Sequence, residues 1–501
     1  MKYIIAIDQG TTSSRAILFD EKSNIVGIEQ MEISLSFPKN DWVEQNGLEI
    51  WQSVYEVIKE VIKTTKVNPL DIVSIGITNQ RETTILWDKE TGIPVYPAIV
   101  WQSRQSKGIC DDLIKKGYKD IIQDKTGLLI NPYFSASKIK FIFDQKPELL
   151  ERAKKGELLF GTVDCFLLWK LTEGKVHATD YSNASRTLLF NIKDLCWDEK
   201  LLEIFNIPKE ILPEVLESSH HFGDATALKS ITDGVIIPIN SLIGDQQASL
   251  FGQCCFKKGD VKNTYGTGCF MLMNIKDEVI KSENGLITTL AWGLDGKVEY
   301  ALEGSVFVGG SAVQWLRDGM RLIEKSKDVE RYSDRIASSN GVYFVPAFVG
   351  LGAPYWDDDA RGSVFGLTRA TKREHFINAL VESIAFQSKD VMEAMISDSK
   401  TKINNLFVDG GASTNNYLMQ FQSDILNCSV IRPSVFETTA KGAAYLAGLN
   451  VKLWKNKEEL ANLQIIDRIF APHMSDETRQ KCYAGWLKAI EATRTFKVSE
   501  D

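Results

Sequence analysis

The sequence lacks the cysteine patterns that would crosslink a chain or hold a metal. Its eight cysteines in 501 residues stand singly or as the neighbours Cys254 and Cys255, with no C-x-x-C spacing and no cysteine–histidine cluster. A disulfide scaffold and a structural zinc site are therefore excluded. We expect reduced thiols, as in a cytoplasmic protein.

Excess positive charge and long apolar runs are missing too. The chain has 58 Lys and Arg against 66 Asp and Glu, a net charge of −8, so it lacks the broad positive field that binds nucleic acid or an anionic membrane. The first apolar run, residues 3–7, is too short for a signal peptide. The longest uncharged stretch, residues 336–356, is broken by three glycines and two prolines, which excludes a bilayer-spanning helix. We expect a soluble protein without nucleic-acid or membrane partners.

The common nucleotide-binding signatures are also absent. The sequence has no G-x-x-x-x-G-K-[ST], no G-x-G-x-x-G that opens a helix, and no H-R-D or D-F-G element. It has instead three turns that each follow a predicted strand: DQGTT at residues 8–12, YGTG at residues 265–268 and DGGAS at residues 409–413. Glycine lets backbone N–H groups approach a phosphate, and hydroxyl groups add donors. One such turn could be a plain tight turn, but three favour nucleotide phosphates.

The length and the order of predicted elements indicate two domains, because one hydrophobic core rarely exceeds about 250–300 residues. Residues 3–7 and 15–20 predict a strand hairpin, residues 48–65 predict a helix, and strands and helices alternate to about residue 250. The pattern restarts at residues 259–270, as if one α/β unit were used twice. We predict domains over residues 1–252 and 253–450, followed by a helical tail over residues 451–501 that forms an exposed helix pair.

Two aspartates stand where strands are predicted to end. Asp8 could bind a Mg²⁺ ion that bridges phosphates, or it could only initiate a turn. Asp245 lies between an apolar strand and a helix. It could accept the proton of a substrate hydroxyl, as phosphoryl transfer to an alcohol requires, or it could cap the helix. The two roles of Asp245 are compatible.

Polar residues at 78–83 follow another predicted strand, and open α/β sheets bind ligands at such ends. Arg81 offers donors and Glu82 offers acceptors, so together they could bind adjacent hydroxyls of a neutral polyol. The alternative is an ordinary surface ion pair. Trp101 and Tyr133 could cover the carbon face of such a ligand, or they could simply pack in the core.

Eight segments in order resemble the FGGY carbohydrate kinase family, and within it the members that act on glycerol. The segments are IDQGTTSSR (7–15), GITNQRET (76–83), AIVWQ (98–102), GDQQ (244–247), NTYGTG (263–268), DDDARG (357–362), DGGA (409–412) and GAAYLAGL (442–449). The resemblance covers residues 3–450. It implies two actin/hexokinase-like (ribonuclease H-like) α/β domains that flank an active-site cleft. It also implies that ATP phosphorylates glycerol to sn-glycerol 3-phosphate with Mg²⁺.

The resemblance also implies roles for single positions. Asp245 is the implied general base, and Asp8 and Asp245 are the implied metal-associated carboxylates. The implied glycerol-binding residues are Arg81, Glu82, Trp101, Tyr133, Asp245, Gln246 and Phe270. The implied nucleotide-binding residues are Thr11, Thr12, Ser13, Arg15, Thr267, Gly310, Gln314, Gly411 and Asn415.

Several points stay open at this level. Lys441 replaces the usual apolar residue of the family and could touch the nucleotide or be solvated. Residues 225–239 contain no Arg and no His, so neither control by fructose 1,6-bisphosphate nor a regulatory phosphohistidine is evident. Another polyol or sugar kinase of the family, or an ATP-driven module such as actin or a heat-shock chaperone, remains an alternative. We expect a homodimer or a homotetramer, although the sequence does not determine the number of subunits.

Overall fold

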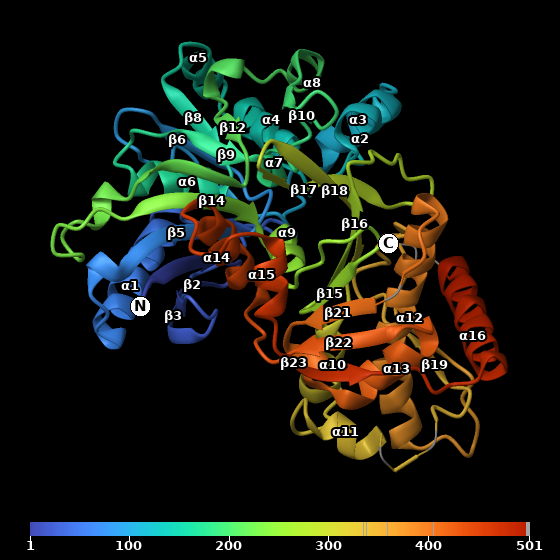
Figure 1. The fold of residues 1–501 in the computed structure, drawn as a ribbon. Helices are drawn as coiled ribbons and strands as arrows, with labels where there is room; N and C mark the ends of the chain where they lie inside the picture. The colour runs from blue at the N-terminus through green and yellow to red at the C-terminus, as the bar shows by residue number, and fades with distance from the viewer. Residues whose placement is uncertain (334, 337, 358, 404, 497–501) are drawn as a thin grey trace.

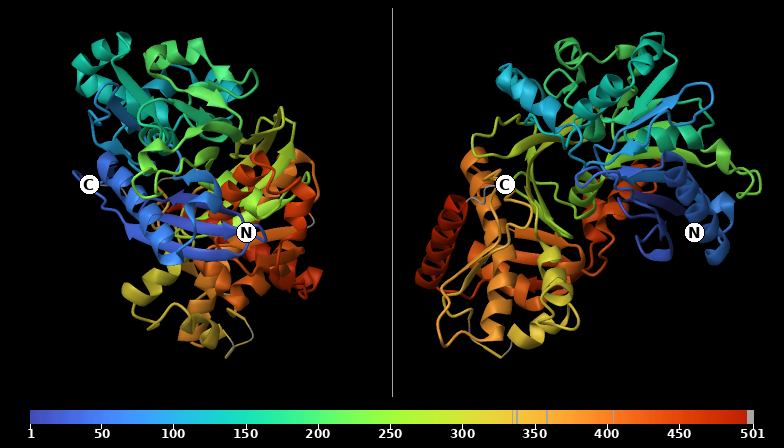
Figure 2. Two further views of the ribbon diagram at one scale, coloured as in Figure 1. Left: turned by 60° about the vertical axis from the view of Figure 1, so that its left-hand side comes forward. Right: turned by 180° about the vertical axis from the view of Figure 1, so that it is seen from behind.

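Two mixed β-sheets, each covered by helices, form two lobes of the molecule (Figure 1), which Figure 2 shows from two further sides. The computed structural model describes residues 1–333, 335–336, 338–357, 359–403 and 405–496. Asp358 of the DDDARG segment and residues 497–501 of the predicted tail lie outside this part of the chain. The predicted α/β class is confirmed.

The N-terminal sheet has six strands in the order β13-β14-β5-β1-β2-β3. These are β1 (Tyr3–Gln9), β2 (Ser13–Asp20), β3 (Ile25–Glu32), β5 (Ile72–Asn79), β13 (Ser219–Asp224) and β14 (Pro238–Gly244). The β1–β5 and β5–β14 pairs are parallel, and the β1–β2, β2–β3 and β13–β14 pairs are antiparallel. The predicted first hairpin is therefore confirmed.

The second sheet has seven strands in the order β17-β18-β16-β15-β21-β22-β23. These are β15 (Val261–Tyr265), β16 (Cys269–Lys276), β17 (Ile287–Leu294), β18 (Lys297–Val306), β21 (Asn405–Asp409), β22 (Ser429–Pro433) and β23 (Ile466–Phe470). The antiparallel hairpin β15–β16 and the parallel pairs β15–β21 and β21–β22 repeat the arrangement of β1, β2, β5 and β14. One strand plan is thus used twice.

Helices cover the sheets and fill the space between them. The helices are α1 (Gly47–Thr65), α2 (Lys107–Lys115), α3 (Lys119–Thr126), α4 (Ser135–Gln145), α5 (Pro147–Lys154), α6 (Val163–Leu171), α7 (Tyr181–Ala184), α8 (Glu199–Phe205), α9 (Asp245–Gly252), α10 (Gly310–Asp318), α11 (Asp328–Ser333), α12 (Arg373–Ser399), α13 (Asn416–Leu426), α14 (Thr438–Asn450), α15 (Lys457–Asn462) and α16 (Asp476–Thr495). The 3₁₀ turns are η1 (Pro69–Asp71), η2 (Lys209–Ile211), η3 (Thr226–Leu228) and η4 (Gly411–Thr414). The remaining strands are β4 (Glu44–Gln45), β6 (Ile85–Asp88), β7 (Ala98–Ile99), β8 (Leu158–Gly161), β9 (Ala178–Asp180), β10 (Phe190–Asn191), β11 (Cys196–Trp197), β12 (Glu214–Leu216), β19 (Tyr343–Val345) and β20 (Ser363–Phe365).

The helix predicted over residues 48–65 is α1, and its ends follow local rules. Asn46 caps its first turn by accepting a hydrogen bond from Leu48 N at 2.9 Å. Its apolar face, with Ile50, Val54 and Val61 buried, packs against β2 and β3. This packing closes the outer face of the N-terminal sheet and leaves the strand ends free for the site.

Helices α9 and α14 join the two lobes. They cross so closely that a β-carbon added to Gly442 would lie 1.9 Å from the carbonyl oxygen of Ala248, so glycine is required there. Although α14 comes from the C-terminal half of the chain, it contacts β1, β5 and β14 of the N-terminal sheet. Its apolar residues belong to a core cluster that also contains residues of both sheets. The crossing therefore fixes where the lobes meet.

The C-terminal segment is more than the predicted helix pair. Between α15 and α16, strand β23 extends the second sheet as the antiparallel partner of β22. Four of its five residues are exposed, and its sequence IDRIF lacks the alternation of apolar and polar residues that predicts a strand. Helix α16 is anchored by the buried Trp486, whose indole donates to Asp390 at 2.8 Å. The prediction of helices alone was wrong for this segment.

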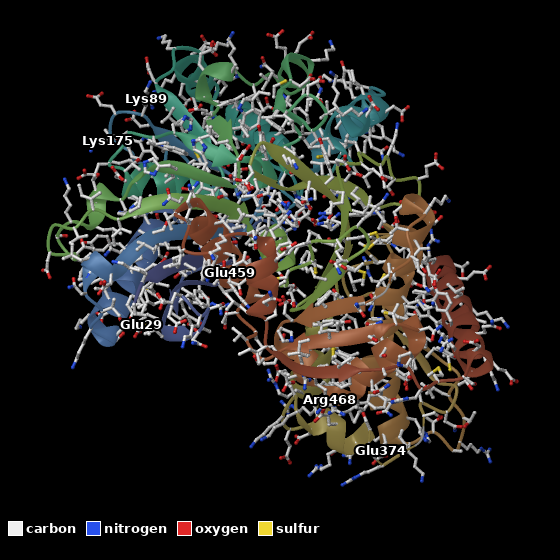
Figure 3. The ribbon with its side chains drawn as sticks, viewed as in Figure 1. Glu29, Lys89, Lys175, Glu374, Glu459 and Arg468 are labelled. Carbon is white, nitrogen blue, oxygen red and sulfur yellow. The ribbon has the colours of Figure 1, made fainter. Side chains whose placement is uncertain are left out.

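In the described residues, no helix has the length and apolar character needed to cross a lipid bilayer. Charged side chains such as Lys89, Lys175 and Arg468 point outward from the ribbon (Figure 3). All eight cysteines are unpaired.

Candidate active site between the two sheets

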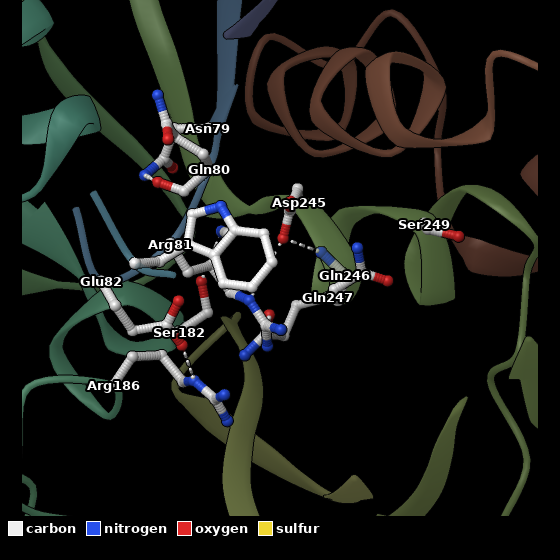
Figure 4. A network of polar contacts seen from close by, with 12 residues as sticks. Asn79, Gln80, Arg81, Glu82, Ser182, Arg186, Asp245, Gln246, Gln247 and Ser249 are labelled. Carbon is white, nitrogen blue, oxygen red and sulfur yellow. Dashed lines mark hydrogen bonds and ion pairs between the residues drawn. The ribbon is translucent and has the colours of Figure 1, made fainter. Parts of the chain in front are cut away.

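Asp245 lies where β14 ends and α9 begins. Gly244 occupies the N-cap position, and Asp245 is the first residue of the helix, so it is not a simple N-cap. Its side chain is 30 % exposed, and its Oδ1 lies 3.1 Å from Arg81 Nε (Figure 4). Burial raises the pKa of Asp245, whereas Arg81 and Lys262 oppose that shift. The site thus offers a reachable carboxylate with a proton affinity above that of an ordinary aspartate.

Arg81 and Glu82 follow β5 and are almost completely buried, which excludes the surface ion pair. Arg81 Nη1 and Nη2 lie 2.6 and 3.0 Å from the two carboxylate oxygens of Glu303 on β18. Glu82 Oε1 accepts a hydrogen bond from Arg186 Nε at 2.6 Å (Figure 4). Arg186 also donates to both oxygens of Glu303, at 3.2 and 3.1 Å. Two arginines and two glutamates therefore alternate in one buried network that spans both lobes.

Glu303 and Arg186 are site residues that the sequence analysis missed. Burial alone would raise the pKa of Glu303, but Arg186 and Arg81 outweigh it and lower the pKa to about 2. Glu303 is thus an anion at neutral pH, and it holds the Arg81 guanidinium in place. A signal was present for Glu303, because it is the one charged residue in the buried stretch 300–306 of β18, and a buried charge must have a partner. Arg186 stands in no recognisable motif.

The backbone of Glu82 is also held in an unusual conformation. Its φ of 59° lies in the left-handed region, which is costly for a residue with a side chain. Hydrogen bonds from Ser135 Oγ (3.0 Å) and Thr84 Oγ1 (3.1 Å) to the Glu82 carbonyl oxygen support it. The surrounding structure therefore fixes the direction in which this carboxylate points.

The three aromatic residues expected around a ligand lie together. The Trp101 ring centroid is 5.6 Å from that of Tyr133 and 6.2 Å from that of Phe270, both in edge-to-face geometry. All three side chains are partly exposed, so they are not ordinary core residues. The Tyr133 hydroxyl accepts from Arg81 Nη2 at 3.4 Å. The aromatic wall and the arginine therefore line one site.

The Trp101 indole connects this site to the first glycine turn, because it donates to Thr11 Oγ1 at 2.9 Å. In that turn, the N–H of Gly10 donates to the carbonyl of Ser13 at 2.9 Å. Thr12 is exposed, and Thr11 and Ser13 are partly exposed. Their hydroxyl groups are therefore accessible to a ligand in contact with Trp101.

The second and third glycine turns lie against each other beside the N-terminus of α10. The N–H of Gly310 donates to the carbonyl of Gly266 at 2.8 Å. A β-carbon at Gly310 would be 2.6 Å from that oxygen and 3.7 Å from Ala412 Cβ, so the close approach requires glycine. Around Gly411 there is open space. The turns present an accessible backbone surface, as phosphate binding requires.

The other predicted nucleotide residues lie around this surface. Thr267 and Gln314 are exposed, and Asn415 is partly exposed. The amide oxygen of Asn415 caps α13 by accepting from Leu418 N at 2.9 Å. The structure thus supplies a structural reason for Asn415, while its role toward a nucleotide stays a prediction.

Asp8 and Arg15 are opposite each other in the first hairpin. Arg15 Nη2 lies 3.7 Å from Asp8 Oδ2, and Arg15 Nη1 lies 2.5 Å from Glu437 at the start of α14. Burial raises the pKa of Asp8 to about 6 although Arg15 opposes the shift, and the negative charges of Glu437 and Asp245 raise it further. Asp8 and Asp245 are thus close enough to interact, whereas a simple turn-initiating Asp8 would be exposed.

The carboxylates of this site suit a Mg²⁺ ion that is shared with substrate phosphates better than a metal ion held by protein ligands alone. The described residues contain no group of three or more His, Cys, Asp or Glu that could hold a metal ion. Mg²⁺ is usually bound by one or two carboxylates together with substrate phosphates and water. The pair Asp8 and Asp245, beside three phosphate-type turns, fits that pattern.

Lys441, the departure from the family pattern, is buried rather than solvated. It is 3 % exposed, its Nζ donates to Gln464 Oε1 at 3.0 Å, and it lies over the ring of Tyr445. Burial lowers its pKa to about 8. Of the two alternatives for Lys441, the solvated side chain was wrong, because packing of α14 against the C-terminal segment covers it; contact with the nucleotide stays a prediction.

Comparisons with known proteins agree with this arrangement. Residues 3–252 and 261–451 match the models of the N-terminal and C-terminal domains of the FGGY family of carbohydrate kinases. The chain is 57% identical over 499 residues to a glycerol kinase of Staphylococcus haemolyticus, covering 100% of both chains. It is 59% identical over 498 residues to a glycerol kinase of Fusobacterium nucleatum, covering 99% of this chain and 100% of the relative. The crystal structure of Plasmodium falciparum glycerol kinase with ADP matches with a TM-score of 0.93 at 39% identity, covering 98% of each chain.

Proposed function

Because the chain belongs to the FGGY family of carbohydrate kinases, we propose that it transfers the γ-phosphoryl group of ATP to a terminal hydroxyl of glycerol. The products are ADP and sn-glycerol 3-phosphate. The full-length glycerol kinase relatives and the relative with bound ADP support this substrate pair. One observation carries the proposal: the Asp245 carboxylate is held by Arg81 at the meeting point of the aromatic wall and the phosphate-type turns.

The polyol side supplies paired donors and acceptors for a neutral triol. Each glycerol hydroxyl both donates and accepts, and Arg81, Glu82, Tyr133 and Gln246 offer both kinds of group. Trp101 and Phe270 cover the carbon chain of glycerol. Large aromatic rings leave little room, which favours a three-carbon substrate over a sugar.

The nucleotide side binds phosphates through the three turns, with Thr11, Thr12, Ser13, Arg15, Thr267, Gly310, Gln314, Gly411 and Asn415 as the predicted contacts. Asp8 and Asp245 would hold Mg²⁺, which neutralises phosphate charge when it is bound. In the proposed reaction, Asp245 accepts the proton of the attacking glycerol hydroxyl.

The proposed catalysis combines positioning with general-base assistance. Holding two reactants in line can remove about 7–11 kcal/mol of the barrier. A general base adds a factor of about 10²–10⁴. Water in place of glycerol would waste ATP, so the lobes should close on the polyol before transfer.

The proposal extends to the cell compartment and to assembly. We place the protein in the cytoplasm as a homodimer or a homotetramer, with domains over residues 1–252 and 253–450. Analytical ultracentrifugation of the purified protein measures the subunit number. A monomer at micromolar concentration would contradict the proposed assembly.

Release of ADP from ATP, with and without glycerol, tests the function. We expect little turnover without a polyol and strong stimulation by glycerol. Xylulose, gluconate and erythritol serve as competing substrates, and a higher kcat/KM for one of them would reassign the substrate. Slow ATP hydrolysis that no polyol stimulates would instead indicate a nucleotide-binding module without an alcohol substrate.

A further inference from the structure

A buried lysine lies behind Gln246, on the strand that leads into the second glycine turn. Lys262 is on β15 and is 0 % exposed. Its Nζ donates to the amide oxygen of Gln246 and to Thr264 Oγ1, the latter at 2.9 Å. Within the described part of the chain, both hydrogen-bond partners of this ammonium group are neutral. Lys262 therefore differs from Arg81 and Arg186, which are paired with carboxylates.

A buried lysine with only neutral hydrogen-bond partners is a costly way to stabilise a fold. Burying an ammonium group without a direct ion pair costs several kcal/mol, and burial lowers the pKa of Lys262 to about 8. Asp409 and Asp245 favour its charged form, whereas Arg81 opposes it. A methionine would fill a similar volume without this cost. The reason for a lysine must therefore lie in what its donors do.

The chemistry of the two groups fixes the orientation of Gln246. An ammonium group only donates, so the atom of the Gln246 amide that faces it is the oxygen. The NH₂ group of Gln246 then points to the opposite side. Gln246 is partly exposed beside Asp245 at the start of α9 (Figure 4), and in the described residues its Nε2 has no protein acceptor. These donors are available to a ligand next to the carboxylate.

The other hydrogen-bond partner of Lys262, on the same strand of the second lobe, is also linked to α9. Thr264, which accepts its other hydrogen bond, lies 3.4 Å from Ser249 Oγ, and Ser249 Oγ donates to Asp409 Oδ2 at 2.7 Å. Ser249 and Gln246 are both on α9, with Ser249 farther from the arginine network (Figure 4). The side chains of β15 and β21 thus hold the catalytic end of α9 at two points. The position of Gln246 is therefore set by both lobes.

We propose that Lys262 is a positioning residue that fixes the Gln246 amide so that its Nε2 donates to a hydroxyl of the polyol substrate beside Asp245. This inference rests on the proposed function. It predicts an effect on polyol binding that passes through Gln246, with little effect on the nucleotide. It also predicts that removal of Lys262 does not destabilise the fold, because a buried charge is lost with it.

Lys262→Met tests the inference. We expect the KM for glycerol to rise about tenfold, as for the loss of one hydrogen bond to a ligand, with kcat and the KM for ATP within about threefold of the wild type. The Tm should be equal or higher. A purely structural lysine would instead lower the Tm and leave the KM for glycerol unchanged, and that result would overturn the inference. Lys276→Met is the matched control, since Lys276 lies on the neighbouring strand and pairs with Glu299.

A double-mutant cycle with Gln246→Ala identifies the route of the effect. In the Gln246→Ala background, Lys262→Met should change the KM for glycerol less than about twofold, because the amide that Lys262 orients is gone. Additive losses would refute a route through Gln246. If Lys262→Met does not fold, Gln246→Glu replaces it: this variant keeps a partner for Lys262 but removes the NH₂ donor. Its KM for glycerol should also rise about tenfold, and an unchanged value would refute the inference.

The wild-type protein separates this inference from the proposed function. If the wild type shows no glycerol-stimulated release of ADP, the proposed function fails and Lys262 has no polyol to act on. If the wild type uses glycerol and both variants keep its KM, only the role of Lys262 fails.

Discussion

The polyol side and the nucleotide side of the site are built by different means. On the polyol side, Arg81, Glu82, Arg186 and Glu303 are at most 2 % exposed and hold one another through direct hydrogen bonds. On the nucleotide side, the predicted contacts are mostly backbone turns with exposed or partly exposed side chains. Buried ion pairs hold the polyol side in place, and backbone conformation holds the nucleotide side in place.

This difference matches the two kinds of ligand. A small neutral polyol has no charge to attract it, so its donors and acceptors must be met by groups that are already in position. A phosphate group can be bound by several backbone N–H groups and by long-range charge, which tolerate changes of individual side chains. Substitutions on the polyol side should therefore have larger effects than substitutions on the nucleotide side.

The largest effect is expected for Asp245→Asn. The amide keeps the shape and the polar contacts of the side chain but cannot accept the proton, so kcat should fall by about 10²–10⁴. Glycerol binding, measured by isothermal titration calorimetry, should remain within about tenfold of the wild type. Near-normal turnover in this variant would remove Asp245 from its role as the base.

Glu303→Gln should have the largest effect on stability. It leaves Arg81 and Arg186 with one buried carboxylate between them, and breaking such a pair costs about 3–5 kcal/mol of unfolding free energy. The pKa of Glu303 is lowered to about 2, from 4.5. The stabilisation is therefore present above pH 4.5 and is lost as the pH falls toward 2. Urea denaturation of both proteins at pH 7 and at pH 4 measures the difference, which should be smaller at pH 4.

Glu299→Gln is the matched control for Glu303. Glu299 lies on the same strand β18 and pairs with Lys276 and Lys457, whose side chains are about one-third exposed. Pairs with exposed members contribute about 0–1 kcal/mol. An equal loss of stability in the two variants would show that the position on β18, rather than the buried network, determines the effect.

The parts of the molecule that could be predicted from the sequence are local. The two hairpins and the glycine turns depend on neighbouring residues, and the structure has them where the sequence indicates. The buried network could not be predicted in the same way, because Arg81 and Glu303 are 222 positions apart. The sequence around either residue does not indicate which partner it contacts in the folded protein. Only the position of Glu303 in the uncharged, buried stretch 300–306 of β18 pointed to such a contact.

The errors in the C-terminal segment have the same origin. Strand β23 is at the edge of its sheet, and its apolar residues Ile466, Ile469 and Phe470 do not alternate with polar ones as in a typical half-buried strand. A solvated side chain was one of the two alternatives for Lys441, yet Gln464 from this segment covers it. In both cases the environment is created by tertiary packing, which a single sequence does not record.

Arg81→Ala should have an intermediate effect on kinetics, expressed mainly in polyol binding, and it should also lower the free energy of unfolding because Glu303 loses a buried partner. Hydrogen bonds from a charged group to a ligand contribute about 1.5–3 kcal/mol, or about 10–150-fold in affinity. The KM for glycerol should rise by that factor, and the KM for ATP should change less than about threefold. Steady-state kinetics with each substrate varied in turn measures both values. An unchanged KM for glycerol would contradict the predicted clamp.

Thr267→Ala should have the smallest effect, and it tests the nucleotide side directly. The residue is exposed, and its backbone carbonyl accepts hydrogen bonds from Gly309 and Ser311 at the start of α10. The substitution removes the hydroxyl and one exposed methyl group and leaves the backbone unchanged, so the turn should survive. The KM for ATP should rise about 2–12-fold, which corresponds to a net hydrogen-bond contribution of about 0.5–1.5 kcal/mol. A loss as large as that of Arg81→Ala would mean that side chains, not the backbone, provide phosphate affinity, and the contrast between the two sides would fail.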